Sequence, residues 1–224
     1  MDYAITLFAQ FLAVMVVLTF HEFAHAYAAY KCGDPTAKYA GRLTLNPTKH
    51  FDLIGLLTFA LVGFGWAKPV PINPYNFKNY KWGSFWTSVA GILVNFISAF
   101  LFFPLYILVS LYVAPLFAGT YAAIFFQQFA KLLFVYSLSF CAFNLLPLYP
   151  LDGFRLLEVF SKKRGKTYQF LADYGYQILI GLVLLSFLAD RVAILAPFNV
   201  LGYVLQFAYN ILGWPITTFW NFVF

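Results

Sequence analysis

Long runs of apolar residues constrain this chain more than any other feature of its sequence. Residues 85–112 hold no charged side chain, and residues 121–146 hold one. Each run exceeds the roughly 20 residues that a helix needs to cross a bilayer. Hydrophobic residues make up 62% of the 224 residues and charged residues only 10%, whereas soluble domains are about a quarter charged. The sequence therefore predicts a polytopic membrane protein.

The order of apolar and polar stretches predicts an all-α membrane fold with five or six transmembrane helices. We expect spanning helices at about 3–30, 85–112, 121–146, 168–189 and 197–224. Residues 51–66 form a shorter apolar run that contains glycines, which is typical of a re-entrant segment. We expect one integral-membrane domain over residues 1–224. Its catalytic core would cover about 5–160, with additional C-terminal helices at about 168–224.

The distribution of positive charge predicts the topology. If residues 51–66 dip into the membrane and return, the basic loops 31–50, 67–83 and 155–166 all lie on one side. The positive-inside rule then makes that side cytoplasmic, with the N-terminus on the opposite side. The net charge of +6 is explained by these loops. We therefore expect the lipid bilayer as a partner, and no nucleic acid.

The motif His21-Glu22-Phe23-Ala24-His25 lies near the end of the first predicted helix. Residues at positions i and i+4 share one helix face, so both imidazoles can reach the same metal ion. Glu22 lies beside the first histidine and can act as the base that activates water. The alternative is a set of buried polar residues satisfied by their neighbours. Ionisable groups inside a membrane segment are costly and usually functional, which favours the metal site.

A catalytic zinc site usually has three protein ligands, and the third has two candidates here. Asp152 follows a stretch interrupted by Pro147 and Pro150, where an irregular backbone can place a carboxylate in a cavity. His50 lies in a polar loop, where a hydrogen-bonding role is the simpler interpretation. We therefore favour Asp152.

Together the two motifs HEFAH and NLLPLYPLDG resemble the site-2 protease family of intramembrane metalloproteases. The resemblance covers roughly residues 5–160 and implies that His21, His25 and Asp152 bind one zinc ion and that Glu22 is the base. AGILVN at 90–95, GRLTLNP at 41–47 and GWAKPVPINP at 65–74 are similar to further parts of that family. Ile92 stands where the family usually has proline. The short loops imply the form without PDZ or CBS domains.

Two asparagines in apolar segments are further candidates. Asn95 and Asn144 could donate to the substrate carbonyl or its oxyanion, or could form hydrogen bonds between helices; the residues leave both readings open. The family resemblance also implies that part of residues 36–75 forms β structure that pairs with an unwound substrate.

The expected activity is zinc-dependent hydrolysis of peptide bonds within or near transmembrane segments, with a transmembrane protein or peptide as substrate. We expect the site near the cytoplasmic face of a bacterial or archaeal membrane. One alternative is a membrane zinc hydrolase with another substrate. Another is a transporter-like protein with a structural metal site, although such sites usually complete their ligand set with Cys or His.

Overall fold

The computed structural model describes residues 2–62, 65–161 and 164–224, so Met1, Gly63, Phe64, Lys162 and Lys163 lie outside the described residues. Within these ranges the regular structure is helical. The long helices are α1 (Asp2–Lys31), α4 (Tyr80–Leu108), α5 (Tyr121–Asn144), α7 (Lys166–Ala189) and α8 (Val200–Val223). The short α-helices are α2 (Thr36–Tyr39), α3 (Leu53–Val62) and α6 (Asp152–Phe160). Short 3-10 or π turns are η1 (Pro47–Lys49), η2 (Pro74–Asn76), η3 (Val109–Val113), η4 (Ala114–Phe117) and η5 (Ala193–Phe198).

Four helices of the described chain are long and apolar enough to cross a membrane: α1, α4 continued to Phe117, α5 and α7. The sequence prediction of five or six is therefore supported for four. The helix α8 also has 24 residues, but it carries polar side chains that lower its mean hydropathy. Two of them, Gln206 and Asn210, form a hydrogen bond of 2.9 Å with each other.

The segment after α1 differs from the expectation of β structure. Among the described residues it holds one isolated antiparallel bridge, between Phe51 and Ala67, and no strand. Residues 53–62 form the helix α3, which satisfies its backbone groups internally. The following stretch contains Pro69, Pro71 and Pro74, which cannot donate to a β ladder. At 10 residues, α3 is about 15 Å long, roughly half of the hydrocarbon core, so it is too short to span.

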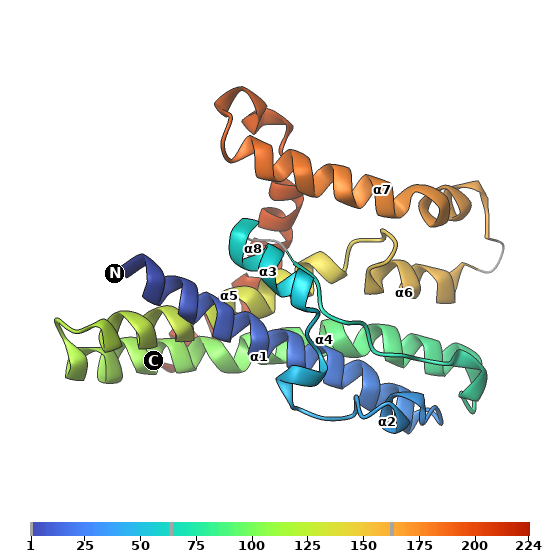
Figure 1. Cartoon of the computed structure of the whole chain (residues 1–224), viewed down its shortest axis with the longest axis horizontal. Helices are drawn as coiled ribbons and strands as arrows, with labels where there is room; N and C mark the ends of the chain where they lie inside the picture. Colours follow the sequence, from blue (N-terminus) through green and yellow to red (C-terminus); the bar gives the residue numbers. More distant parts are fainter. Residues whose placement is uncertain (1, 63–64, 162–163) are drawn as a thin grey trace.

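The helices α1, α4 and α5 pack together as the centre of the molecule (Figure 1). Small buried residues such as Ala13 and Ala99 let these helices approach closely. Leu133 packs with Ala13 and Val17. On another face, a cluster of Ala99, Phe134, Leu138 and Ile216 joins α8 to the bundle.

The helix α7 stands apart from this bundle and contacts mainly η5 and α8 (Figure 1). Two cavities lie between α7 and the bundle. One, of about 900 Å³, is lined by residues of α1, α3, α5, α7 and α8. The other, of about 800 Å³, contains the motif residues of α1 and the start of α6. The separation of α7 therefore creates the space in which the predicted site lies.

Candidate metal centre

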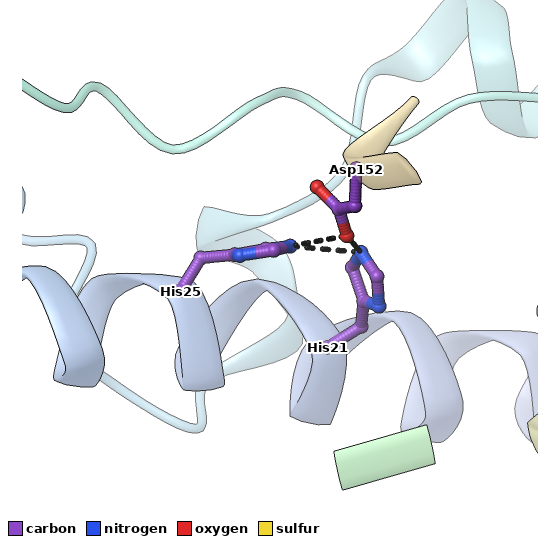
Figure 2. A group of neighbouring side chains, drawn as sticks. All are labelled: His21, His25 and Asp152. Atoms are coloured by element: carbon purple, nitrogen blue, oxygen red, sulfur yellow. Dashed lines mark hydrogen bonds and ion pairs between the residues drawn. The ribbon is translucent and has the colours of Figure 1, made fainter. Parts of the chain in front are cut away.

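His21 and His25 lie one turn apart on the same face of α1, as the motif spacing predicts. Their Nε2 atoms are 3.0 Å apart, and the two rings meet edge to face at 83°. Both side chains are buried, His21 at 6% exposure and His25 at 5%. Figure 2 shows both imidazoles directed toward Asp152.

Asp152 is the first residue of α6. The preceding residues 145–151, which contain Pro147 and Pro150, have no continuous helix and bring the chain back toward α1. Gly153 lies directly against the carbonyl oxygens of Leu145 and Leu146, where a Cβ atom would have no room. Its role is therefore close packing of α6 on the end of α5. This packing places Asp152 Oδ2 3.1 Å from His25 Nε2 and 3.4 Å from His21 Nε2.

The three side chains fit a cation. One ligand atom from each of His21, His25 and Asp152 lies within 4.8 Å of the others, and all three residues are buried. Asp152 Oδ2 is buried and receives no well-formed hydrogen bond from the described residues. Two imidazole nitrogens and a carboxylate oxygen that share a buried site favour positive charge between them. The set of two His and one Asp suits zinc with an open position.

Each histidine has a second partner on α4. His25 Nδ1 lies 2.7 Å from the carbonyl oxygen of Thr87. Since a carbonyl only accepts, Nδ1 carries the proton and donates it, which leaves the lone pair of His25 Nε2 directed at the site. His21 Nδ1 lies 3.0 Å from the side-chain amide of Asn95. The helix α4 thus orients both rings from behind.

Gly91 of α4 provides the space for this arrangement. A Cβ atom at this position would collide with His21 and with Nε2 of His25. The glycine therefore lets α4 pack directly beneath the two imidazole rings. This requirement is steric and does not involve an unusual backbone conformation, because Gly91 lies within a regular helix.

Glu22 lines the same cavity as His21, His25 and Asp152. Its Oε2 atom accepts a hydrogen bond of 3.1 Å from the backbone N–H of Val70. The side chain is 9% exposed. A carboxylate therefore lies next to the metal-ligand group and is held by the loop between α3 and α4.

The remaining candidates from the sequence separate in space. Asn144 lines the cavity, and its Nδ2 donates to the carbonyl oxygen of Phe140 at 3.1 Å. Asn95 is completely buried behind His21. His50, the alternative third ligand, is also completely buried, and its Nε2 donates to the carbonyl oxygen of Thr44 at 2.8 Å. Burial lowers the pKa of His50. It does not belong to the group around Asp152.

Sequence reasoning did not identify the contacts of Thr87 and Val70 with the site residues, or the burial of Arg42. Thr87 and Val70 act through backbone atoms, which leave no side-chain signature. Arg42 is an arginine in a basic loop, but the structure buries it to 5% exposure. The glycine at 91 was visible within AGILVN, although its reason, contact with both imidazoles, was not.

Comparisons with known proteins identify relatives of this chain. A protein of Bacillus subtilis (strain 168) named "Putative zinc metalloprotease YwhC" is 42% identical over 171 residues, which cover 75% of this chain and 77% of the relative. The chain belongs to peptidase family M50. The profile of that family matches residues 108–187, which include Asp152.

A second relative of this M50 protein is more distant. "Putative zinc metalloprotease Rip2" of Mycolicibacterium smegmatis is 31% identical over 178 residues, which cover 76% of this chain and 64% of the relative. No solved structure matches the chain. Membership of M50 confirms the resemblance to site-2 proteases and identifies the chain as a zinc metalloprotease of the membrane, with a buried His-His-Asp candidate metal site.

Proposed function

We propose that this M50 protein is an intramembrane zinc endopeptidase that cuts peptide bonds within or near transmembrane segments of other proteins. One observation carries the proposal. The group of His21, His25 and Asp152 shares an apolar cavity with Glu22, between helices of membrane-spanning length. A protease site in such a place has access to membrane-embedded chains.

His21, His25 and Asp152 would hold one zinc ion per chain. Zinc, when bound, acts as a Lewis acid that polarises a carbonyl and makes water a stronger acid. Glu22 is the proposed base: it accepts a proton from water and returns it to the leaving amine. The hydrogen bond from Val70 N–H holds the Glu22 carboxylate in the cavity that also contains the ligand group.

Asn144 is the better placed of the two asparagines for contact with the substrate. It lines the cavity together with the ligand group, and its amide can donate to a carbonyl oxygen that gains negative charge. Asn95 contacts His21 instead. We propose that Asn144 contributes to oxyanion stabilisation and that Asn95 orients a ligand.

The two cavities suggest how a transmembrane substrate is held. They share lining residues on α1, α5 and α7, including Leu18, Phe140 and Val183. The walls are mainly apolar, which suits a substrate segment that comes from lipid. The substrate class is therefore a transmembrane protein or peptide rather than a soluble protein.

Topology and domain organisation complete the proposal. Figure 1 shows α2, α6 and the beginning of α4 toward one end of the molecule, and the N-terminus and the α4–α5 connection toward the other. The first end carries the described basic loop residues, which favours a cytoplasmic location in a bacterial or archaeal membrane. The proposed catalytic core covers residues 5–160, α3 acts as a re-entrant element, and the helices of 168–224 complete one domain.

The test is cleavage of a model transmembrane peptide by the purified protein in detergent. Wild type and Glu22→Gln are compared, and the zinc content of both is measured. We expect both to hold about one zinc ion and only the wild type to cut. Equal cleavage by both would contradict the role of Glu22. Zinc binding with hydrolysis of a lipid-linked compound but no peptide would favour the alternative membrane hydrolase, and unchanged function of Glu22→Gln would favour a structural metal site.

A further inference from the structure

Residues 67–72, which we call the strap, cross the wall of the site cavity between α3 and α4. The strap has no helix and only the single bridge at Ala67. Ala67, Pro69, Val70 and Ile72 line the cavity that contains His21, Glu22, His25 and Asp152. Val70 is 7% exposed and packs with Ala26 and Ala37. The strap is therefore a fixed part of the wall.

The middle of the strap has a single hydrogen-bond donor. In Pro69-Val70-Pro71 only Val70 carries a backbone N–H, because proline has none. That N–H donates to Glu22 Oε2 at 3.1 Å. The position of the strap therefore determines the position of this donor to the proposed base.

Arg42 holds the first half of the strap. Its Nη1 donates to the carbonyl oxygen of Pro69 at 3.1 Å, and its Nη2 donates to the carbonyl oxygen of Lys68 at 2.5 Å. The two acceptors immediately precede Val70. The N–H of Lys68 is also held, because it donates to the carbonyl oxygen of His50 at 2.9 Å.

We propose that Arg42 is a positioning residue for the reaction: its guanidinium holds the strap so that Val70 N–H orients the Glu22 carboxylate. This inference rests on the proposed role of Glu22 as the base. The evidence is a continuous chain of contacts from Arg42 through Lys68 and Pro69 to Val70 and Glu22. Arg42 acts through the strap and is not itself placed on the substrate.

The chemistry of the guanidinium explains why an arginine occupies this position. Its planar fork presents two parallel donors, which match two consecutive carbonyl oxygens, whereas the ammonium of lysine is a single point. Burial lowers the pKa of Arg42, and the negative charge of Glu22 opposes that shift. Arginine also remains charged when buried, so its two hydrogen bonds to the strap do not depend on pH in the physiological range.

The hydrogen bonds that hold the strap have a consequence for substrate binding. The carbonyl oxygens of Lys68 and Pro69 and the N–H groups of Lys68 and Val70 all have partners inside the protein. These four backbone groups are therefore not free to pair with a substrate strand. The stretch from Lys68 to Val70 serves instead to position Glu22.

Hydrogen exchange of the purified full-length protein, with and without zinc, provides a readout independent of activity. Because Pro69 and Pro71 have no amide hydrogen, overlapping peptides isolate the Val70 amide. We expect Arg42→Met to accelerate exchange of this amide by at least about tenfold, because the strap loses its anchor. Arg42→Lys should restore part of the protection, since it keeps the charge but not the fork.

Kinetics provide the second readout. For cleavage of the model transmembrane peptide, Arg42→Met should lower kcat by about tenfold or more with little change in KM, because the orientation of the base is lost while substrate contacts remain. Zinc content should match the wild type. The matched control is Lys38→Met, which removes an exposed charge from the same loop; Lys38 contacts Tyr30 rather than the strap. In Lys38→Met, the exchange rate of the Val70 amide and kcat should equal those of the wild type.

The outcomes separate this inference from the proposed function. If Glu22→Gln is inactive but Arg42→Met has wild-type Val70 exchange and wild-type kcat, the positioning role is wrong. If Glu22→Gln remains fully active, the proposed function fails, whatever Arg42 does. If Arg42→Met does not fold, Val70→Pro replaces it as the test, because it removes the donor and leaves Arg42 in place. A wild-type kcat in a folded, zinc-loaded Val70→Pro variant would overturn the inference.

Discussion

The side-chain amide of Asn95 lies directly behind His21, with Asn95 Nδ2 3.0 Å from His21 Nδ1. The other amide atom, Oδ1, is buried and has no partner among the described residues. Rotation of the amide plane by 180° exchanges the two atoms. In that orientation Oδ1 accepts a hydrogen bond from His21 Nδ1–H. The lone pair of His21 Nε2 then faces the other proposed metal ligands. As an acceptor for His21 Nδ1, Asn95 would therefore support metal binding.

This relationship predicts a loss of zinc affinity when the acceptor is removed. Asn95→Leu should weaken zinc binding by about 10–100-fold, as expected for loss of a partner behind a ligand. Asn95→Asp keeps an acceptor. Its zinc affinity should be at least as high as that of Asn95→Leu and close to that of the wild type. Competition with a chromophoric chelator measures both affinities.

Asn144→Leu is the matched control, because its amide contacts the backbone of Phe140 and neither histidine. Its zinc affinity should be unchanged, and its cleavage rate should fall. Equal zinc affinity of Asn95→Leu and the wild type would show that Asn95 does not orient His21.

A methyl group at Gly91 should disrupt the metal centre. Gly91→Ala would place a Cβ atom against His21 and His25, so the rings must shift and zinc affinity should fall at least about tenfold. Alanine favours helix over glycine by about 1 kcal/mol, so loss of zinc affinity would not reflect weaker helix formation in α4. Isothermal titration with zinc measures the effect. Gly181→Ala on α7 is the control, because a Cβ there meets open space; a similar loss in both variants would contradict the steric explanation.

Filling the junction of the two cavities should affect long substrates selectively. Val183 lines both cavities. We expect Val183→Trp to lower kcat/KM for a transmembrane peptide by about tenfold, equivalent to about 1.4 kcal/mol, and to affect a short soluble peptide much less. Parallel kinetics with the two substrates measure the difference. The control is Leu188→Trp, at an exposed position of α7 outside both cavities, which should leave both rates unchanged. If Val183→Trp lowered kcat/KM equally for both substrates, the junction would not be a binding path for transmembrane segments.

Asp34 should stabilise the loop region in a pH-dependent way. It is completely buried and accepts hydrogen bonds from Thr36, Asn73 and Asn76 at 2.5–3.1 Å. Burial alone would raise the pKa of Asp34, but these hydrogen bonds outweigh it and hold the pKa below its usual value. Because the folded-state pKa is depressed, the stabilisation is present above the unfolded-state pKa of about 3.9 and is lost as the pH falls through the folded-state value.

The measurement for Asp34 is the free energy of unfolding in detergent at several pH values. Asp34→Asn should be less stable than the wild type by about 2 kcal/mol at pH 6, as expected for hydrogen bonds to a charged group. The difference should shrink as the pH falls below about 4. Asp173→Asn, at an exposed position of α7, is the control. A difference that stays constant from pH 6 to pH 3 would show that the charge of Asp34 does not contribute.

Much of the site could be predicted from the sequence because the spacing of its two histidines depends only on local helix geometry. The spacing of His21 and His25 follows from the helix period, and their Nε2 atoms meet at 3.0 Å. The pairing with Asp152 came from the residue types of two motifs and their resemblance to one family, and the structure brings all three together. The helical, membrane-embedded class followed from long apolar runs, which need no tertiary information.

Other features were decided only by tertiary packing. The partners of His25, His21 and Glu22 lie 62, 74 and 48 residues away in the chain, and no local period relates such positions. The expected β structure after α1 is replaced by α3 and a proline-rich strap. In α3, helix formation satisfies the backbone groups. In the strap, the prolines have no N–H to donate to a β ladder. His50 and Asp152 were both possible ligands by residue type; the fold ties His50 to Thr44 and places Asp152 beside the histidines.

The sequence by itself determined which residues have the chemistry for a metal site and that they lie in a membrane, because residue type, helix period and hydrophobicity are properties of short segments. The tertiary structure decided what surrounds them: the carbonyl of Thr87 and the amide of Asn95 behind the ligands, the strap above Glu22, and the cavities beside α7. These depend on how distant helices and loops pack, and that packing is a property of the whole chain.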